Sequence, residues 1–213
     1  MGRSIVTNAA KHKGAKVVVN IDLKDFFPSI TKEMVASGTF KNKLEPTEFK
    51  DVLRFCFSKG RLPQGAPTSP AIANIVCWKL DVRLAALAAQ PSWRATYTRY
   101  ADDLTFSSRK GRALHKIIPL ITKVVEEEGF SVNTDKIRVM RHTGRISVTG
   151  LVVNRKVNLP REEARRLRAI FHQAKPESDL QRLAGYAGFV TAVNRPKGRR
   201  YTKQIRALAK VAG

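Results

Sequence analysis

The sequence predicts an α+β fold in which helices cover one face of an antiparallel sheet, with a helical region after it. Two observations support this class. Over residues 16–154, β-branched segments and amphipathic segments follow one another in the order β-α-β-β-α-β, which suits such a sheet. From Asn154 the composition changes to basic helical sequence. We therefore expect two domains, residues 1–154 and residues 155–213.

The first half of the predicted sheet domain combines one strand with helices and a long loop. Residues 16–22 (KVVVNID) are β-branched and indicate a buried strand. Residues 25–30 (DFFPSI) turn the chain. A helix is predicted over 46–57, and residues 59–70, with two Gly and three Pro, must form a loop. An apolar helix is predicted over 69–89.

The second half of this domain adds the remaining strands. Residues 94–100 and 104–107 are predicted to be short strands around a tight turn. A helix is expected over 113–128, because Gly129 provides a stop signal. Two further strands are predicted over residues 136–140 and 145–154.

The C-terminal region is predicted to be helical and basic. Pro160 opens an amphipathic helix whose first turn holds Glu162 and Glu163. No acidic residue follows Asp179, whereas eight basic residues do. These are Arg182, Arg195, Lys197, Arg199, Arg200, Lys203, Arg206 and Lys210. A solvated basic face is the alternative, but contact with phosphates is the interpretation that we favour.

The charge of the whole chain points to a polyanionic partner. Forty Lys and Arg stand against 17 Asp and Glu, which gives a formal net charge of +23. Such an excess repels itself unless a polyanion neutralises it, so nucleic acid is the expected partner. The alternatives are a basic protein that is merely soluble and one that binds an anionic membrane. With no secretory pattern at the start, Cys56 and Cys77 are interpreted as reduced thiols, and a cytoplasmic location is expected.

Three aspartates suggest a site for divalent cations. Asp102 and Asp103 are adjacent at the tip of the predicted hairpin, and neighbouring carboxylates repel each other unless a cation lies near them. Asp22 ends an apolar strand, where an unpaired charge is costly, and that strand end can lie beside the hairpin tip. Three carboxylates would then hold two Mg²⁺ ions for phosphoryl transfer. An Asp-Asp turn without a ligand is the alternative.

Four motifs resemble those of reverse transcriptases, in the same order. They are residues 20–30 (NIDLKDFFPSI), residues 62–70 (LPQGAPTSP) with Asn74, residues 100–103 (YADD), and residues 129–133 (GFSVN) with Lys136. Two shorter elements favour the retron enzymes within this family: residues 8–12 (NAAKH) fit their NAxxH element and residues 148–150 (VTG) their VTG element. The resemblance implies a palm with a remnant of the fingers in 1–154 and a basic helical thumb in 155–213.

The resemblance also implies roles at the reaction centre. Asp22, Asp102 and Asp103, with the Leu23 carbonyl, would hold two Mg²⁺ ions. The Phe27 ring would leave no room for a 2′-hydroxyl on the incoming sugar, although either Phe26 or Phe27 must pack inward. Lys136 would donate a proton to the departing pyrophosphate, or it is a surface lysine. Contacts with the incoming nucleotide are implied for Asp25, Phe26, Phe27, Gln64 and Gly65.

Nucleic-acid contacts and partners are implied in the same way. The residues expected at the nucleic acid are Asn8, His12, Tyr100, Arg165, Arg166 and Arg168; His12 could equally be packed inside the protein. The implied activity is RNA-directed DNA synthesis from dNTPs on a structured non-coding RNA, within an antiphage defence system. An effector protein, or a chain that supplies the fingers, is a candidate partner.

One departure from the family keeps other interpretations open. Only about twenty residues precede Asp22, so the fingers are expected to be largely absent. The sequence would then be a truncated chain, a compact member or one half of a split enzyme. The alternatives are a non-catalytic or split-subunit RNA-binding module, and a group II intron-type or diversity-generating reverse transcriptase.

Overall fold

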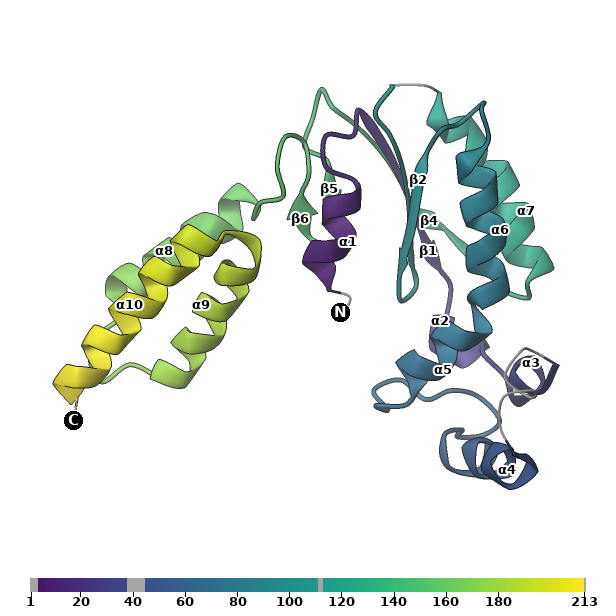
Figure 1. The fold of residues 1–213 in the computed structure, drawn as a ribbon, viewed down its shortest axis with the longest axis horizontal. Helices are drawn as coiled ribbons and strands as arrows, with labels where there is room; N and C mark the ends of the chain where they lie inside the picture. Colours follow the sequence, from purple (N-terminus) through teal and green to yellow (C-terminus); the bar gives the residue numbers. More distant parts are fainter. Residues whose placement is uncertain (1–3, 38–44, 111–112, 213) are drawn as a thin grey trace. The chain divides into compact units, whose positions relative to one another are not determined.

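A computed structural model of the chain describes residues 4–37, 45–110 and 113–212 (Figure 1). Its contacts divide it into two compact units, residues 15–144 and residues 1–14 with 145–213. This division differs from the boundary that the composition suggests after residue 154. The reason is that helix α1 (Ile5–Lys11) packs against two short strands within residues 147–152. Helix α1 and these strands belong to the same unit as the C-terminal helices.

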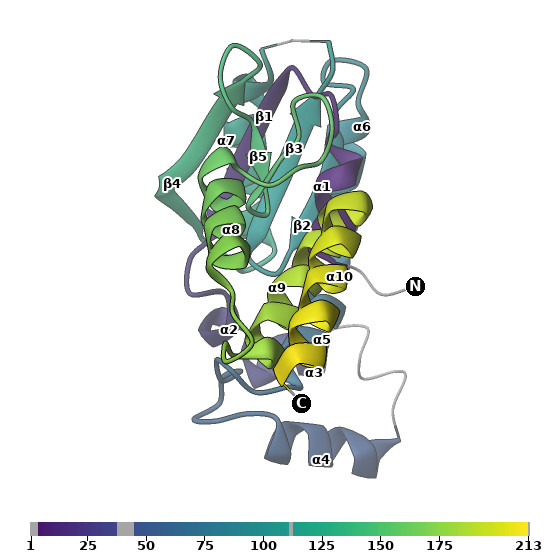
Figure 2. The same ribbon diagram turned by 90° about the vertical axis from the view of Figure 1, so that its left-hand side faces the viewer.

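The larger unit is built on a four-stranded antiparallel sheet. Its strands are β1 (Val17–Leu23), β2 (Thr96–Tyr100), β3 (Asp103–Ser108) and β4 (Val132–Arg141). They lie in the order β2-β3-β1-β4, and every neighbouring pair is antiparallel (Figure 2). The α+β class predicted from the sequence is confirmed. Strand β1 is central because its β-branched residues can be buried on both sides.

Helices cover one face of this sheet. These are α6 (Trp78–Ala89) and α7 (Ile118–Glu127), with the 3₁₀ turn η2 (Leu114–Ile117) before α7; the other helices of this unit are α2 (Phe26–Ser29), α3 (Lys32–Ser37), α4 (Pro46–Phe55) and α5 (Ser69–Val76). Figure 1 shows α6 and α7 side by side along the sheet. Alternate residues of β1, such as Val19 and Ile21, enter the hydrophobic core with Leu84 of α6 and Ile121 of α7. Helix packing thus determines which face of β1 remains for polar residues.

The side chains of the remaining β1 residues point to the opposite face of the sheet. Asn20 and Asp22 are both half-buried there, because successive side chains of a strand point to opposite sides. Asn20 lies opposite Thr105 of β3, and Asp22 lies opposite Asp103. One edge of this face therefore gathers polar side chains from two strands.

The smaller unit contains α1, a short hairpin and three long helices. The hairpin is formed by β5 (Ser147–Val148) and β6 (Leu151–Val152), and the helices are α8 (Arg161–Gln173), α9 (Leu180–Val193) and α10 (Arg195–Ala212). The strand predicted over 145–154 is thus two short strands. Thr149 and Gly150 both have positive φ in the turn between them, and the Thr149 hydroxyl donates to the Ile5 carbonyl at 3.0 Å.

The three long helices share a small core of their own. The rings of Phe171 in α8 and Tyr201 in α10 stack with centroids 3.9 Å apart, and the Gln204 side chain donates to the Phe171 carbonyl. Pro160 is the N-cap of α8, as the sequence predicts. Among the described residues, no helix combines the length and the apolar character needed to span a membrane.

Candidate active site

The sheet brings the three predicted aspartates to one place. Asp22, near the end of β1, is directly opposite Asp103 at the start of β3. The backbone N–H of Leu23 donates to the Asp102 carbonyl at 3.0 Å. Ala101 has a φ of 53°, in the left-handed region, and this makes the β2–β3 turn tight enough to place Asp102 beside β1.

The charges of these carboxylates influence one another. Burial raises the pKa of Asp102 above its ordinary value, and the negative charge of Asp22 raises it further. Burial likewise raises the pKa of Asp103, with the charges of Asp102 and Asp22 acting in the same direction. The Asn20 amide opposes this effect because it donates to Asp103, and it also donates to Thr105 Oγ1 at 3.2 Å. The cluster therefore favours a nearby positive charge.

Lys136 supplies one positive charge at this cluster. Its Nζ lies 3.1 Å from Asp22 Oδ2, although 60% of the lysine side chain is exposed. Strand β4 pairs with β1 here, with Asn133 opposite Asp22, so the lysine reaches the cluster from the neighbouring strand. An exposed ammonium on a flexible side chain can move away from Asp22 at small cost.

The carboxylates open into a cleft of about 430 Å³. It is lined by Asp22, Leu23, Lys24, Asp25, Phe26, Phe27, Gln64, Asp102, Asn133 and Lys136. Most of the residues that the sequence suggests for the reaction centre therefore share one cavity. Asp103 and Gly65 are not among its lining residues. Gly65 has a φ of 85°, a conformation that favours glycine, and Tyr100 is 42% exposed at the end of β2.

The two phenylalanines at the cleft differ in burial. Phe26 is 4% exposed and belongs to the hydrophobic core, where its ring lies 6.0 Å from that of Phe130. Phe27 is half-buried, with its ring 5.2 Å from the Phe26 ring. Both residues line the cleft, and Phe27 is the more exposed of the two.

The donor atoms at this cluster fit a hard divalent cation. Carboxylate oxygens and a backbone carbonyl are the ligands that Mg²⁺ accepts, and the negative charge of Asp22 raises the pKa of Asp102. The Lys136 ammonium occupies a compensating position at Asp22. Within residues 4–37, 45–110 and 113–212, no three His, Cys, Asp or Glu side chains are grouped closely enough to hold a metal ion.

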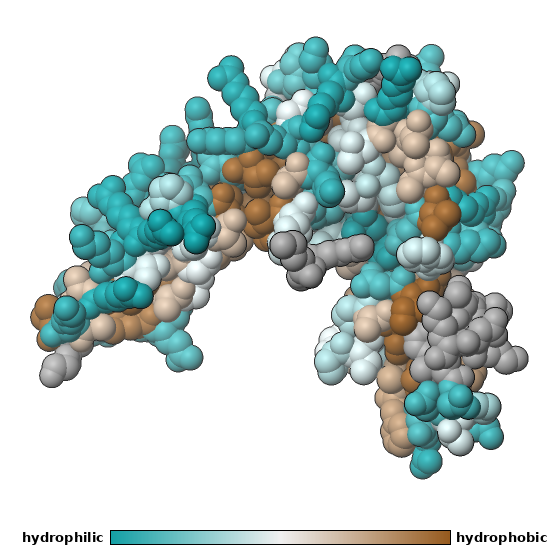
Figure 3. All heavy atoms as spheres, viewed as in Figure 1, coloured by the Kyte–Doolittle hydropathy of each residue, from teal (hydrophilic) through white to brown (hydrophobic). Residues whose placement is uncertain are grey.

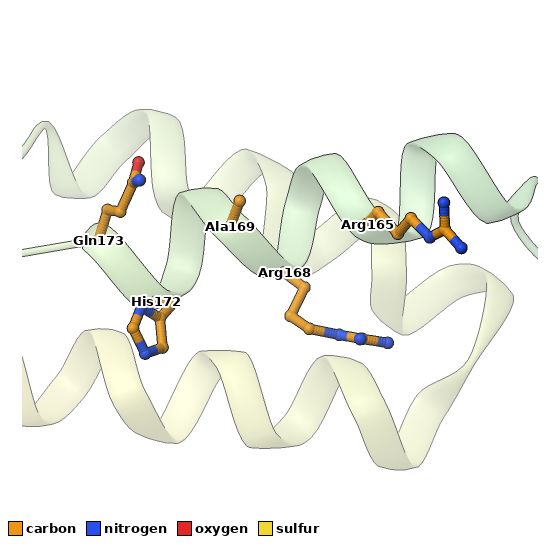
Figure 4. A pocket seen from close by; sticks show the side chains of 5 residues that line it. All are labelled: Arg165, Arg168, Ala169, His172 and Gln173. Atoms are coloured by element: carbon orange, nitrogen blue, oxygen red, sulfur yellow. The ribbon is translucent and has the colours of Figure 1, made fainter.

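The three arginines predicted at the nucleic acid differ in their environment. Arg166 donates twice to Glu163, at 2.9 and 2.7 Å, and its guanidinium lies over the Tyr186 ring. Arg165 and Arg168 are exposed and line a pocket of about 250 Å³ on α8. Figure 4 shows their side chains on one helix together with Ala169, His172 and Gln173. These two arginines are available to an anion, whereas Arg166 is already paired.

The two N-terminal candidates are less accessible. His12 is 1% exposed, and burial lowers its pKa to about 4; this favours the packed histidine that the sequence leaves open. Asn8 is half-buried, and its Nδ2 atom is buried without a hydrogen-bond partner among the described residues. Its contact with nucleic acid stays a prediction.

Two polar residues of the site have no role in the sequence prediction. Asn20 lies within the first motif and holds Asp103, and Asn133 lies within the fourth motif and lines the cleft. The signal for Asn20 is its spacing of two from Asp22, which puts both side chains on one face of the strand. No comparable local signal exists for Asn133, because its position depends on the pairing of β4 with β1.

Comparison with known proteins identifies the family. Residues 1–163 match the family described as reverse transcriptase (RNA-dependent DNA polymerase). The chain is 41% identical to the Retron Mx162 reverse transcriptase of Myxococcus xanthus, over 99% of this chain and 51% of that protein. It is 36% identical to the Retron Ec86 reverse transcriptase of Escherichia coli (99% and 66%) and 34% identical to the Retron Ec73 enzyme of the same organism (90% and 67%). The chain thus spans about half to two thirds of these relatives.

Solved structures show the same fold at low sequence identity. The foamy viral protease-reverse transcriptase, solved in complex with an RNA/DNA hybrid, aligns with a TM-score of 0.55 at 18% identity, over 97% of this chain and 29% of that one. The apo telomerase of Candida tropicalis aligns with a TM-score of 0.52 at 14% identity, over 73% and 38%. The fold is that of a reverse-transcriptase palm and thumb. With a family match over more than half of its length, the chain belongs to the reverse transcriptases and, within them, to the retron type.

Proposed function

We propose that this chain is an RNA-directed DNA polymerase that extends a primer with dNTPs on a structured non-coding RNA. The observation that supports this most directly is the meeting of Asp22 and Asp102 at a cleft that Phe27, Gln64 and Lys136 also line. The retron reverse transcriptases that the chain resembles agree with this activity. We further propose that the chain acts as a retron-type enzyme within an antiphage defence system.

In this proposal two Mg²⁺ ions bind at Asp22, Asp102 and Asp103, with the Leu23 carbonyl as a further ligand. When bound, such ions activate the attacking hydroxyl and stabilise the charge that develops on the leaving pyrophosphate. The chain's own contribution is to hold the carboxylates in place. Asn20 holds Asp103 through its amide, and the hydrogen bond from Leu23 to the Asp102 carbonyl joins the turn to β1.

The other cleft residues would bind and orient the nucleotide. The Phe27 ring would lie against the sugar and exclude a 2′-hydroxyl. Gln64 and Gly65 would lie against the nucleotide and the template, and the backbone amides of Asp25 and Phe26 would donate to triphosphate oxygens. Lys136, released from Asp22, would give its proton to the departing pyrophosphate or stabilise its charge.

The C-terminal helices would hold the nucleic-acid duplex as a thumb. Hydrophilic side chains gather on the upper side of α8–α10 in Figure 3. On α10, Arg195, Arg199, Lys203, Arg206 and Lys210 recur at intervals of three to four residues and therefore share one face of the helix. Each is an exposed residue. Together with Arg165 and Arg168 of α8, they would neutralise phosphates without regard to base sequence.

A primer-extension assay with the full chain tests this function. We expect the protein to incorporate dNTPs on an RNA template in the presence of Mg²⁺. Asp102→Asn should lower incorporation by at least about 10³-fold, because loss of a single electrostatic group at a reaction centre can cost that much. RNA binding by this variant should stay within about twofold of the wild type. Asp51→Asn, on exposed α4, is the control and should behave as the wild type.

Two outcomes would point elsewhere. If the wild-type protein binds RNA but extends no primer, it is a non-catalytic or split-subunit RNA-binding module, and addition of candidate partner chains distinguishes these two. If Asp102→Asn extends the primer normally, the metal assignment is wrong. Sequencing the RNA that co-purifies separates the retron assignment from a group II intron-type or diversity-generating enzyme, because a retron enzyme carries one short folded species.

A further inference from the structure

Arg99 has a buried guanidinium close to the candidate active site. It lies in β2, two residues before Ala101, and its side chain is 5% exposed. Nε and Nη2 donate to the two carboxylate oxygens of Asp81 on α6, at 2.9 and 2.8 Å. Nη1 donates to the Ala101 carbonyl at 3.1 Å. One guanidinium therefore joins a helix that covers the sheet to the turn that carries Asp102.

The Ala101 carbonyl belongs to the residue with the least favourable backbone conformation in this turn. Ala101 has a φ of 53°, in the left-handed region that is unfavourable for a non-glycine residue. The next residue, Asp102, accepts a hydrogen bond from the Leu23 N–H at 3.0 Å. The turn is thus held on one side by Arg99 and on the other by β1, and Asp102 lines the cleft.

The same guanidinium also contacts the aromatic pair of the cleft. Arg99 Cζ lies 5.9 Å from the centroid of the Phe26 ring, within the range of a cation–π interaction. Phe26 packs against Phe27, whose side chain lines the cleft. Arg99 itself does not line the cleft. Any effect that it has on the reaction must therefore pass through Ala101 and Phe26.

The partner of Arg99 is itself held in place. The Tyr97 hydroxyl donates to Asp81 Oδ1 at 2.8 Å, and the Tyr97 ring lies 4.8 Å from that of Phe106 in the core. Burial and the Asp81 charge raise the pKa of Tyr97 well above its ordinary value, so its hydroxyl remains a donor. A planar guanidinium can serve Asp81 and the Ala101 carbonyl at once, whereas a lysine ammonium lacks this fork geometry.

We propose that Arg99 is a positioning residue for the polymerase reaction, because it holds the Ala101–Asp102 turn and the Phe26 ring in a fixed relation. The proposal rests on the proposed function, since it assigns Arg99 to the same reaction centre. In the absence of this guanidinium the turn loses one of its two supports, and Asp102 moves relative to Asp22. A displacement of about 1 Å at a reaction centre can lower the rate about 10²-fold.

The test compares Arg99→Gln and Arg99→Lys with a matched control, Arg83→Gln. Arg83 is on the same helix as Asp81, and its guanidinium bonds to two carboxylates, those of Glu127 and Glu128, away from the hairpin. Both glutamine variants therefore lose an arginine–carboxylate pair of α6. Four quantities are measured on the full chain: kcat and KM for dNTP in primer extension, the midpoint of thermal unfolding, and the hydrogen-exchange rate of the Leu23 amide.

We expect Arg99→Gln to lower kcat by about 10- to 100-fold, with KM for dNTP changed less than about threefold. The Leu23 amide should exchange at least about tenfold faster, because its acceptor on Asp102 becomes mobile. Arg99→Lys should recover part of the loss in kcat. Arg83→Gln should lower the unfolding midpoint while kcat and the Leu23 exchange rate stay within about twofold of the wild type.

The proposal is overturned if Arg99→Gln lowers the unfolding midpoint but matches Arg83→Gln in kcat and in Leu23 exchange. If Arg99→Gln does not fold, the comparison is made with Asp81→Asn, which removes the charge that Arg99 pairs with but leaves Arg99 in the chain. If the wild-type protein extends no primer, the proposed function fails instead. The exchange rate of the Leu23 amide then still decides whether Arg99 holds the turn.

Discussion

Phe26 and Phe27 are neighbours in the chain and both line the cleft, but Phe26 is buried in the core whereas Phe27 is only partly buried against it. We expect Phe27→Ala to admit ribonucleotides, because removal of the ring opens space for a 2′-hydroxyl. The ratio of kcat/KM for dNTP to that for rNTP should fall by about 10²-fold or more, which corresponds to roughly 3 kcal/mol. Primer extension with single nucleotides measures this ratio. Phe27→Tyr keeps the ring and should keep the discrimination; an unchanged ratio in Phe27→Ala would remove Phe27 from this role.

The buried imidazole of His12 makes the stability of the protein depend on pH. Burial lowers the pKa of His12 from 6.5 to about 4, so the folded state favours the neutral ring more than the unfolded state does. The contribution of His12 is therefore fully present above pH 6.5 and is lost as the pH falls from 6.5 towards 4. At one pKa unit per 1.36 kcal/mol, the loss amounts to roughly 3 kcal/mol at most.

Urea unfolding between pH 7.5 and pH 5 measures this effect. The free energy of unfolding of the wild type should decrease over this interval more steeply than that of His12→Gln, which cannot take up the proton. His142→Gln is the control, because His142 is exposed, and it should follow the wild type. Parallel curves for the wild type and His12→Gln would show that His12 takes up its proton over the same pH range in the folded and the unfolded protein, which contradicts a lowered pKa.

At the scale of the secondary-structure elements, α9 and α10 pack closely at Gly198. A Cβ at Gly198 would overlap the backbone and hydroxyl of Thr191 on α9, and backbone atoms cannot move aside without disturbing the helix hairpin. We expect Gly198→Ala to destabilise the protein by about 1–3 kcal/mol. Gly188→Ala in α9 is the control. Its Cβ would meet no atom within 4 Å, so the better helix propensity of alanine should stabilise the protein by up to about 1 kcal/mol. Equal effects in thermal unfolding would contradict this account.

At the scale of the whole molecule, the sequence predicts the elements better than the contacts between them. The β-branched segment 16–22 predicts β1, observed as Val17–Leu23, because local period and residue type determine a buried strand. The helix predicted over 69–89 is interrupted at Cys77, where neither Gly nor Pro marks a break. The contact of Arg99 with Asp81 joins residues 18 positions apart in sequence. Such a contact depends on how β2 packs beneath α6, and no local pattern contains that information.

At the candidate site, too, the sequence predicts which elements meet but not the contacts of individual side chains. The spacing of the motifs predicts that Asp22 approaches the Asp102–Asp103 turn, because an antiparallel sheet with hairpin connections allows few other arrangements. The orientation of each carboxylate is not predictable in this way. Asp103 accepts a hydrogen bond from Asn20 and is not among the residues that line the cleft, and this depends on side-chain hydrogen bonds. The contrast between paired Arg166 and the two available arginines of α8 likewise depends on Tyr186 and Glu163.

The distribution of charge over the molecule implies that RNA binding and catalysis can be changed separately. The carboxylates of the candidate active site belong to residues 15–144, whereas Arg165 and Arg168 belong to the other unit. We expect the double variant Arg165→Gln, Arg168→Gln to bind an RNA/DNA duplex more weakly. The slope of log K against log[salt] should become shallower by about 1–2, since each released phosphate contact contributes about 0.9. At saturating duplex, kcat should stay within about threefold of the wild type.

Fluorescence anisotropy over a series of KCl concentrations, together with primer extension, measures both effects. Arg166→Gln is the matched control, because Arg166 is held by Glu163 and the Tyr186 ring, and its slope should change by less than half as much. Asp102→Asn should show the reverse pattern, with the slope retained and extension lost. If Arg166→Gln weakens binding as much as the double variant, α8 binds the duplex only through its total positive charge. Arg165 and Arg168 would then make no specific contribution to binding. A double variant that loses kcat and affinity together would instead mean that α8 places the primer terminus at Asp22 and Asp102 as well as holding phosphates.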